Sequence, residues 1–313
     1  MEFEKMSQIP PKNPNLLVKV TEMGNIIETQ YMSRRNSKQT IQMLKGGEEY
    51  VICATGEIRH VEHHETREEN RKGLYKTFAN ARALINTNVT DVEKVRWCTL
   101  TYKENMRDTK KLYIDFQQFN QRFQYYCKQK GYSKPEYIVM MEPQGRGAWH
   151  AHLLYIWQDQ KAPYIPNKEF NELWGHGFVR IKKLDNVDNV GAYLTAYLGD
   201  MELGEIKPEE FNVCGKGKAK IVEIEDENGK KVSKAIIKGA RLGLYPANFN
   251  MIRYSRGIKK PEPEMMSQEE ANKKVSAATK TFESAFRLTD TANEFDTIII
   301  KEQYNRVRSK KQS

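Results

Sequence analysis

The sequence lacks any long hydrophobic run, and its content of apolar residues is low. The strongest apolar runs, at residues 137–141 and 153–157, are far shorter than the roughly 20 residues that a membrane-spanning helix requires. Hydrophobic residues supply 39% of the 313 positions, which argues against an integral membrane protein. Aromatic residues still supply 10%, which is enough to build a folded core and excludes a wholly disordered chain.

Closely spaced cysteines are also missing. The four cysteines, Cys53, Cys98, Cys127 and Cys214, are widely separated and form no C-x-x-C motif. This spacing argues against a zinc ribbon and against a disulfide framework, so we expect reduced thiols. The first fifteen residues contain acids and no apolar signal core, and these features together favour a cytoplasmic protein.

Acidic residues are outnumbered by basic ones. The sequence has 51 Lys and Arg against 41 Asp and Glu, a formal net charge of +10. Such a balance favours a polyanionic partner, and charge alone leaves DNA, RNA and membrane surfaces open. The sequence has no G-x-x-x-x-G-K-[ST] motif, because the GKGK at residues 215–218 lacks the leading glycine.

Composition divides the chain into three segments. Residues 1–90 form an N-terminal extension, with a hairpin pattern around Gly24 and a basic stretch of helical spacing at residues 65–84. Residues 91–260 hold the clearest alternation of strand and helix patterns. Residues 261–313 are polar, and we expect a helical C-terminal tail there.

The middle segment predicts the fold class. Runs of β-branched and aromatic residues predict strands, and apolar residues at helical spacing predict helices. We expect strands at residues 95–102, 135–142, 148–157 and 177–184, and helices at residues 108–130, 167–174, 186–198 and, in the C-terminal segment, 267–286. The order predicts an α+β fold, with a central, mostly antiparallel sheet and helices on one face. Asn228-Gly229, between two alternating runs, predicts a further hairpin.

Two histidines on the third of these strands are candidates for a chemical site. Successive strand residues point to opposite faces, so His150 and His152 share one face. Glu142 ends the preceding strand, and a short Gly-rich turn brings it beside the histidines. Two imidazoles and one carboxylate can bind Mn²⁺ or Mg²⁺ and leave positions open for a substrate. The alternative is a pair of ordinary polar surface histidines.

Two tyrosines on the helix predicted at residues 186–198 are further candidates. Tyr193 and Tyr197 are four residues apart, so they lie on one helical face. A free phenol is a weak nucleophile, but a nearby cation lowers its pKa and polarises a target phosphorus atom. The alternative is that both tyrosines pack an amphipathic helix against the sheet.

Three features follow one another in a characteristic order: the strand WCTLTY, the pattern E-x7-H-A-H on adjoining strands, and Y-x-x-x-Y on a later helix. In this order they resemble the HUH-superfamily rolling-circle replication initiators, the Rep proteins of small plasmids and of single-stranded DNA phages and viruses. The resemblance covers residues 96–200 and continues more faintly at residues 241–261. It implies an HUH endonuclease fold with a ferredoxin- or RRM-like core.

The same resemblance implies roles for the candidate residues. Glu142, His150 and His152 would bind the metal, and Tyr193 and Tyr197 would form the nucleophile region, with Tyr193 attacking first and Tyr197 as its partner. The implied activity is site-specific nicking and joining of single-stranded DNA at an origin hairpin of a plasmid or phage, through a 5′-phosphotyrosine intermediate. A host helicase and a host DNA polymerase would be partners, since the sequence shows no helicase motif.

Other functions share these motifs. A mobilisation relaxase and a transposase of the HUH type use the same chemistry, and a non-catalytic binder of RNA or DNA could use a similar sheet. The sequence departs from the family at Ala151, where a bulky apolar residue is usual. It departs again at Ala196 and Asp200, where many relatives place a lysine, so the charge-stabilising role of that lysine is unassigned.

Overall fold

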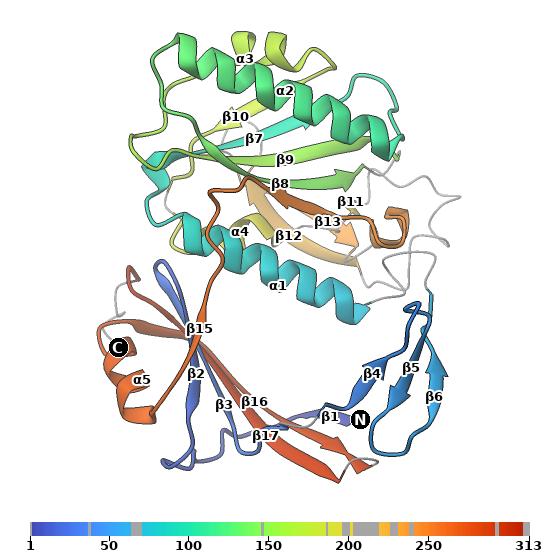
Figure 1. The fold of residues 1–313 in the computed structure, drawn as a ribbon. Coiled ribbons are helices and arrows are strands. Elements are labelled where there is room, and N and C mark those ends of the chain that lie inside the picture. The colour runs from blue at the N-terminus through green and yellow to red at the C-terminus, as the bar shows by residue number, and fades with distance from the viewer. Residues whose placement is uncertain are drawn as a thin grey trace. The chain divides into compact units, whose positions relative to one another are not determined.

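The computed structural model describes residues 2–36, 39–63, 71–144, 147–185, 187–195, 201–202, 219–225, 231–237, 241–291 and 294–308. The chain forms two compact units, one from Met1–His63 with Lys260–Ser313 and the other from His64–Lys259. This division differs from the three segments expected from composition. The C-terminal residues do not form a separate tail, because they pair with N-terminal strands in one sheet (Figure 1).

The first unit contains a six-stranded antiparallel sheet with the order β1-β16-β17-β3-β2-β15. Its strands are β1 (Glu2–Lys5), β2 (Val18–Met23), β3 (Ile26–Met32), β15 (Pro263–Met266), β16 (Thr279–Asp290) and β17 (Phe295–Asn305). The predicted hairpin is confirmed, since β2 pairs with β3 and Gly24 adopts a φ of 60° in the turn. The helix α5 (Gln268–Val275) packs Ala271 and Val275 into a core cluster with Ile27 and Ile300 of the sheet.

The helix expected at residues 267–286 is correct only in its first part. Ser267 and Glu270 form a reciprocal capping box that starts α5, but the helix ends at Val275. From Thr279 onward the sequence TKTFESAFRLTD is rich in threonine and phenylalanine, which favour a strand. Antiparallel pairing with β17 runs through β16 from end to end, and this long-range pairing overrides the local helical spacing.

A smaller three-stranded antiparallel sheet lies in the same unit. It consists of β4 (Ile41–Met43), β5 (Glu49–Ile52) and β6 (Ile58–His60), in that order. Its side chains are exposed or half-buried.

The second unit is built around a five-stranded antiparallel sheet with the order β10-β7-β9-β8-β14. Its strands are β7 (Val95–Thr101), β8 (Glu136–Pro143), β9 (Trp149–Ile156), β10 (Val179–Lys182) and β14 (Ile252–Tyr254). The helix α2 (Thr109–Gln129) connects β7 to β8, and β9 lies between these two strands. This is the split β-α-β arrangement of a ferredoxin-like core, so the predicted α+β fold class is confirmed.

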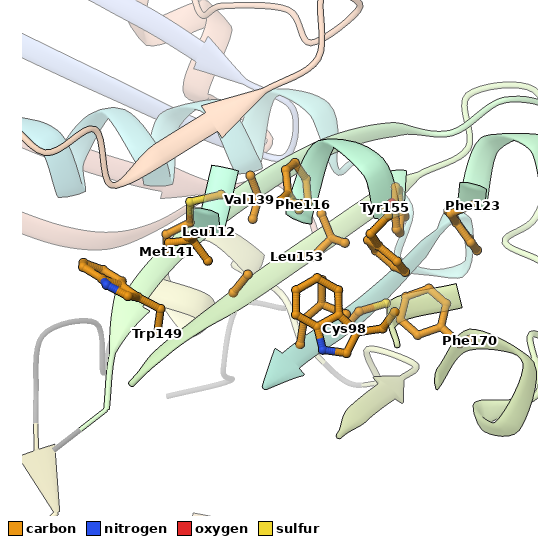
Figure 2. Close-up of a cluster of buried hydrophobic side chains, with 14 of the residues drawn as sticks. Cys98, Leu112, Phe116, Phe123, Val139, Met141, Trp149, Leu153, Tyr155 and Phe170 are labelled. Carbon is orange, nitrogen blue, oxygen red and sulfur yellow. The ribbon is translucent and has the colours of Figure 1, made fainter. Parts of the chain in front are cut away.

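One face of the central sheet is covered by α2 and α3 (Asn167–Trp174). Asp108 caps α2 by accepting hydrogen bonds from the first backbone N–H groups of the helix. Figure 2 shows the buried cluster on this face, where Phe116 of α2 and Phe170 of α3 join Leu153 and Tyr155 of β9. The alternation of β9 therefore buries the face that the sequence predicted.

Helices also cover part of the opposite face, which the sequence did not predict. A second cluster joins Ile85 of α1 (Arg71–Asn88) and Leu194 of α4 (Val190–Thr195) to Leu154 and Ile156 of β9. Leu154 and Ile156 share the face of the two histidines, and their apolar side chains need a cover that α1 and α4 supply. The basic stretch expected as a helix at residues 65–84 contributes to α1.

A third, three-stranded sheet contains β11 (Met201–Glu202), β13 (Lys231–Ile237) and β12 (Ala219–Glu225) in that order. β12 and β13 pair antiparallel, as the hairpin prediction requires, while the Asn228-Gly229 turn lies outside the described residues. Among the helices in the described ranges, none has the length and apolar content to cross a membrane.

Candidate metal centre

The hairpin of β8 and β9 brings the three predicted metal ligands together. In its register Glu142 lies opposite His150, and Met140 lies opposite His152. Directly opposed residues of an antiparallel pair point to the same face, and so do residues two apart on one strand. Ligand atoms from Glu142, His150 and His152 consequently lie within 4.8 Å of one another.

The Glu142 carboxylate lies between the two imidazoles. Its Oε2 is 3.2 Å from Nε2 of His150 and 3.3 Å from Nε2 of His152. Two atoms that bind one ion at about 2.2 Å, at right angles to each other, are about 3.1 Å apart, so these separations fit a shared cation. Two nitrogens and one carboxylate oxygen also leave coordination positions open. The group could therefore hold a metal ion.

Burial and neighbouring charges set the charge states of these groups. Burial alone would raise the pKa of Glu142, but hydrogen bonds with both histidines and the charge of Arg241 outweigh it and hold that pKa well below its ordinary value. Burial, and then the neighbouring His152, lower the pKa of His150 to about 4 against the opposing effect of Glu142. At neutral pH Glu142 is ionised and His150 is neutral, which are the forms that bind metals.

Arg241 is a member of the site that the sequence did not reveal. Its Nη1 lies 3.0 Å from Oε2 of Glu142, and both side chains are almost fully buried. Arg241 directly precedes a short 3-10 turn, Leu242–Leu244, and Tyr245 follows with its ring edge against Trp149. The one sequence signal for this segment was the faint family likeness at residues 241–261, which carried no indication of an ion pair with β8.

The strand β7 holds His152 from the other side. The rings of Trp97 and His152 stack with centroids 5.3 Å apart and planes 1° apart. Thr99 lies opposite His152 in the register, and its Oγ1 is 3.5 Å from Nδ1 of the imidazole. Such neighbours fix the orientation of a ligand ring so that its other nitrogen faces the ion.

Of the two candidate tyrosines, Tyr193 falls within the described residues. It lies on α4 and is 51% exposed, so its hydroxyl is accessible from solvent. On the same helix, Val190 and Leu194 pack into the cluster on the histidine-bearing face of the sheet. Asn86 of α1 anchors the helix by accepting a hydrogen bond from the N–H of Gly191. Tyr197 lies outside the described residues.

An antiparallel sheet that presents one acid and two imidazoles beneath a tyrosine-bearing helix defines a class of candidate metal-dependent nucleic-acid enzymes. Residues 95–202 match a family of replication-associated proteins designated ORF2. The match covers about a third of the chain, includes all five candidate residues, and confirms the resemblance to rolling-circle replication initiators. Searches of curated proteins and of solved structures found no significant match.

Proposed function

We propose that this protein initiates rolling-circle replication by nicking and joining single-stranded DNA at an origin. The observation that carries the proposal is the convergence of Glu142, His150 and His152 on one face of the sheet, within the segment that matches a replication-associated family. The basic charge of the chain supports DNA as the substrate, because Lys and Arg bind phosphates without regard to sequence.

The metal centre would serve the phosphodiester at the cut. Glu142, His150 and His152 would hold Mn²⁺ or Mg²⁺, which would neutralise the charge that develops on the non-bridging phosphate oxygens. The chain fixes the position of those ligands through the β8–β9 register and through Trp97 and Thr99. The neutral state of His150 keeps its nitrogen lone pair available.

The tyrosines would supply the covalent chemistry. The Tyr193 phenol loses its proton and its oxygen bonds to phosphorus, while the 3′ oxygen of the preceding nucleotide leaves and takes up a proton. The product is a 5′-phosphotyrosine ester and a free 3′-OH. Tyr197 or a DNA 3′-OH then attacks this ester, which rejoins the strand without ATP. A host polymerase would extend the 3′-OH, and a host helicase would open the duplex.

A covalent-capture experiment tests the proposal. The full chain is incubated with a random single-stranded DNA library and Mn²⁺, and labelled adducts are separated on a denaturing gel. We expect an adduct that requires Mn²⁺, that EDTA prevents, and that His150→Ala eliminates. Tyr164→Phe is a matched control, because Tyr164 is 80% exposed and is not part of the site. If the wild-type protein binds the library but forms no adduct, the protein is a binder and the proposal is wrong.

A further inference from the structure

The central sheet extends from the metal centre towards its β10 edge as ordered rows of side chains. In one row Glu142 of β8 and His150 of β9 lie beside Thr101 of β7. In the next row His152 lies beside Thr99 of β7, and Thr99 lies beside Arg180 of β10. Opposed residues share a face, so all of these side chains belong to the face that carries the candidate metal centre.

Phe178 extends the first row at the sheet edge. Its backbone carbonyl accepts a hydrogen bond from the N–H of Thr101 at 2.9 Å, which places it beside the His150 row. Because Arg180 lies on the metal-centre face, strand alternation puts Phe178 on that face as well. Its ring is 72% exposed, an unusual state for a phenylalanine in a folded unit.

The local backbone holds Phe178 firmly in this place. Gly177 approaches β7 so closely that a Cβ atom there would lie 2.3 Å from the Thr101 carbonyl oxygen. The N–H of Lys103 also donates to the carbonyl of His176, and the Trp174 indole donates to the carbonyl of Thr101. The exposed ring is thus attached to a well-anchored edge rather than to a loose loop.

Charge follows the aromatic ring along the same edge. Arg180 and Lys182 alternate with Val179 and Ile181 on β10. Val179 and Ile181 pack against the cluster under α2, which leaves the two basic residues on the metal-centre face. Neighbouring strands are about 4.8 Å apart, so the backbone of Arg180 lies about 10 Å from that of His152.

We propose that Phe178 and Arg180 form a subsite that binds the nucleotide next to the scissile phosphate. Phe178 stacks on the base, and Arg180 binds a backbone phosphate. This assignment deepens the proposed function and rests on it for the position of the cut. The occupant is single-stranded DNA, because an exposed ring can stack only on a base that is unpaired and the adjoining charge is positive.

Binding without cleavage isolates this subsite. Fluorescence anisotropy with a labelled, mixed-sequence single-stranded oligonucleotide is measured in EDTA, where no nicking occurs. We expect Phe178→Ala to raise the Kd roughly five- to a hundredfold and Phe178→Trp to restore it. We expect Arg180→Gln to weaken binding and to reduce the slope of log K against log salt by about one.

The matched controls lie on α2, which covers the opposite face of the sheet. Tyr125→Ala removes an exposed aromatic ring, and Lys128→Gln removes an exposed charge, and neither should change the Kd. Mn²⁺-dependent thermal stabilisation should be unchanged in all four edge and control variants, since none removes a metal ligand.

The outcomes separate this inference from the proposed function. If Phe178→Ala and Arg180→Gln bind as tightly as the wild type, or if only duplex binding falls, the subsite is wrong even where covalent adducts form. If both variants weaken single-strand binding while the wild type forms no adduct, the nicking function fails and the subsite stands.

Discussion

Arg241 and Glu142 form a buried ion pair in which Nη1 lies 3.0 Å from Oε2, the same carboxylate oxygen that faces Nε2 of both histidines. A cation bound by the two histidines and Glu142 would share this oxygen with the guanidinium. Arg241 therefore balances the charge of Glu142 when no metal is bound, and its own positive charge opposes metal binding. The ion pair links the stability of the site to its metal affinity.

Arg241→Met should separate these two effects. The change leaves the Glu142 carboxylate buried without its cationic partner, so we expect a loss of about 3 kcal/mol in the free energy of unfolding in EDTA. Mn²⁺ should restore stability more strongly in the variant than in the wild type, because the competing charge is gone. Urea unfolding with and without Mn²⁺ measures both effects. Lys161→Gln, which breaks the exposed pair with Glu93, is the control and should change neither. Equal Mn²⁺ stabilisation in Arg241→Met and wild type would contradict the competition.

Removal of a metal ligand should abolish the response to metal. Ligand binding stabilises the folded state by RT ln(1 + [L]/Kd), about 2.7 kcal/mol at a hundredfold excess over Kd. We expect Glu142→Gln and His152→Ala to lose most of the Mn²⁺-dependent rise in melting temperature, together with nicking. His63→Ala is the control, because its side chain is exposed and pairs with Glu48, away from the candidate ligands. A full Mn²⁺ response in His152→Ala would show that the ion binds elsewhere.

The two tyrosines should differ in the step that they support. Tyr193→Phe removes the proposed first nucleophile, so we expect the covalent adduct to form at least about a thousandfold more slowly. Tyr197→Phe should still form the adduct but should lose strand joining that depends on a second phenol. Gel assays of cleavage and joining on the captured sequences measure the two steps. An adduct that persists in Tyr193→Phe and disappears in Tyr197→Phe would reverse the order.

Glu302 predicts an acid-sensitive stability of the first unit. Lys12, Lys280 and Thr29 hydrogen-bond its carboxylate at 2.6, 2.9 and 2.7 Å. Burial would raise its pKa, but these bonds outweigh burial and lower the pKa to about 2. A lowered pKa in the folded state stabilises the fold above the unfolded value of 4.5, and this stabilisation disappears as pH falls from about 5 towards 2.

We therefore expect Glu302→Gln to lower the free energy of unfolding at pH 7 by roughly 2–3 kcal/mol and to flatten its dependence on pH below 5. Urea unfolding of the full chain at several pH values, followed by a probe in the first unit, measures this. Asp296→Asn, which removes an exposed partner of Arg287, serves as the control. A variant that loses stability with acid as steeply as the wild type would rule out Glu302 as the source.

Local patterns were sufficient to predict the metal ligands. The spacing of His150 and His152 on one strand and the short turn after Glu142 depend on two-residue alternation, which the structure follows. Arg241 could not be found in this way, because its contact with Glu142 crosses a long stretch of chain and leaves no periodic trace. Tyr193 was placed on a helix correctly, whereas its relation to the cation depends on packing that the sequence does not encode locally.

The misjudged elements have the same origin. The strand β16 has helical spacing in its sequence, and pairing with β17 decides its conformation. The helix α1 was treated as part of an extension, although Ile85 packs beside Leu154 of the central sheet in one buried cluster. Burial of Leu154 and Ile156 required a cover on the histidine face, and this requirement was present in the sequence of β9.

The order of synthesis has a consequence for the first unit. Its N-terminal hairpin, β2 and β3, leaves the ribosome early, but β17, which lies between β3 and β16, follows every other strand of that sheet along the chain. Until β17 emerges, one side of β3 has no neighbour, and an unpaired strand edge invites aggregation. The continuous second unit can fold during translation, whereas the sheet of the first unit closes only after β17 has been made. Premature termination would therefore leave nascent chains with a sticky edge that chaperones must shield.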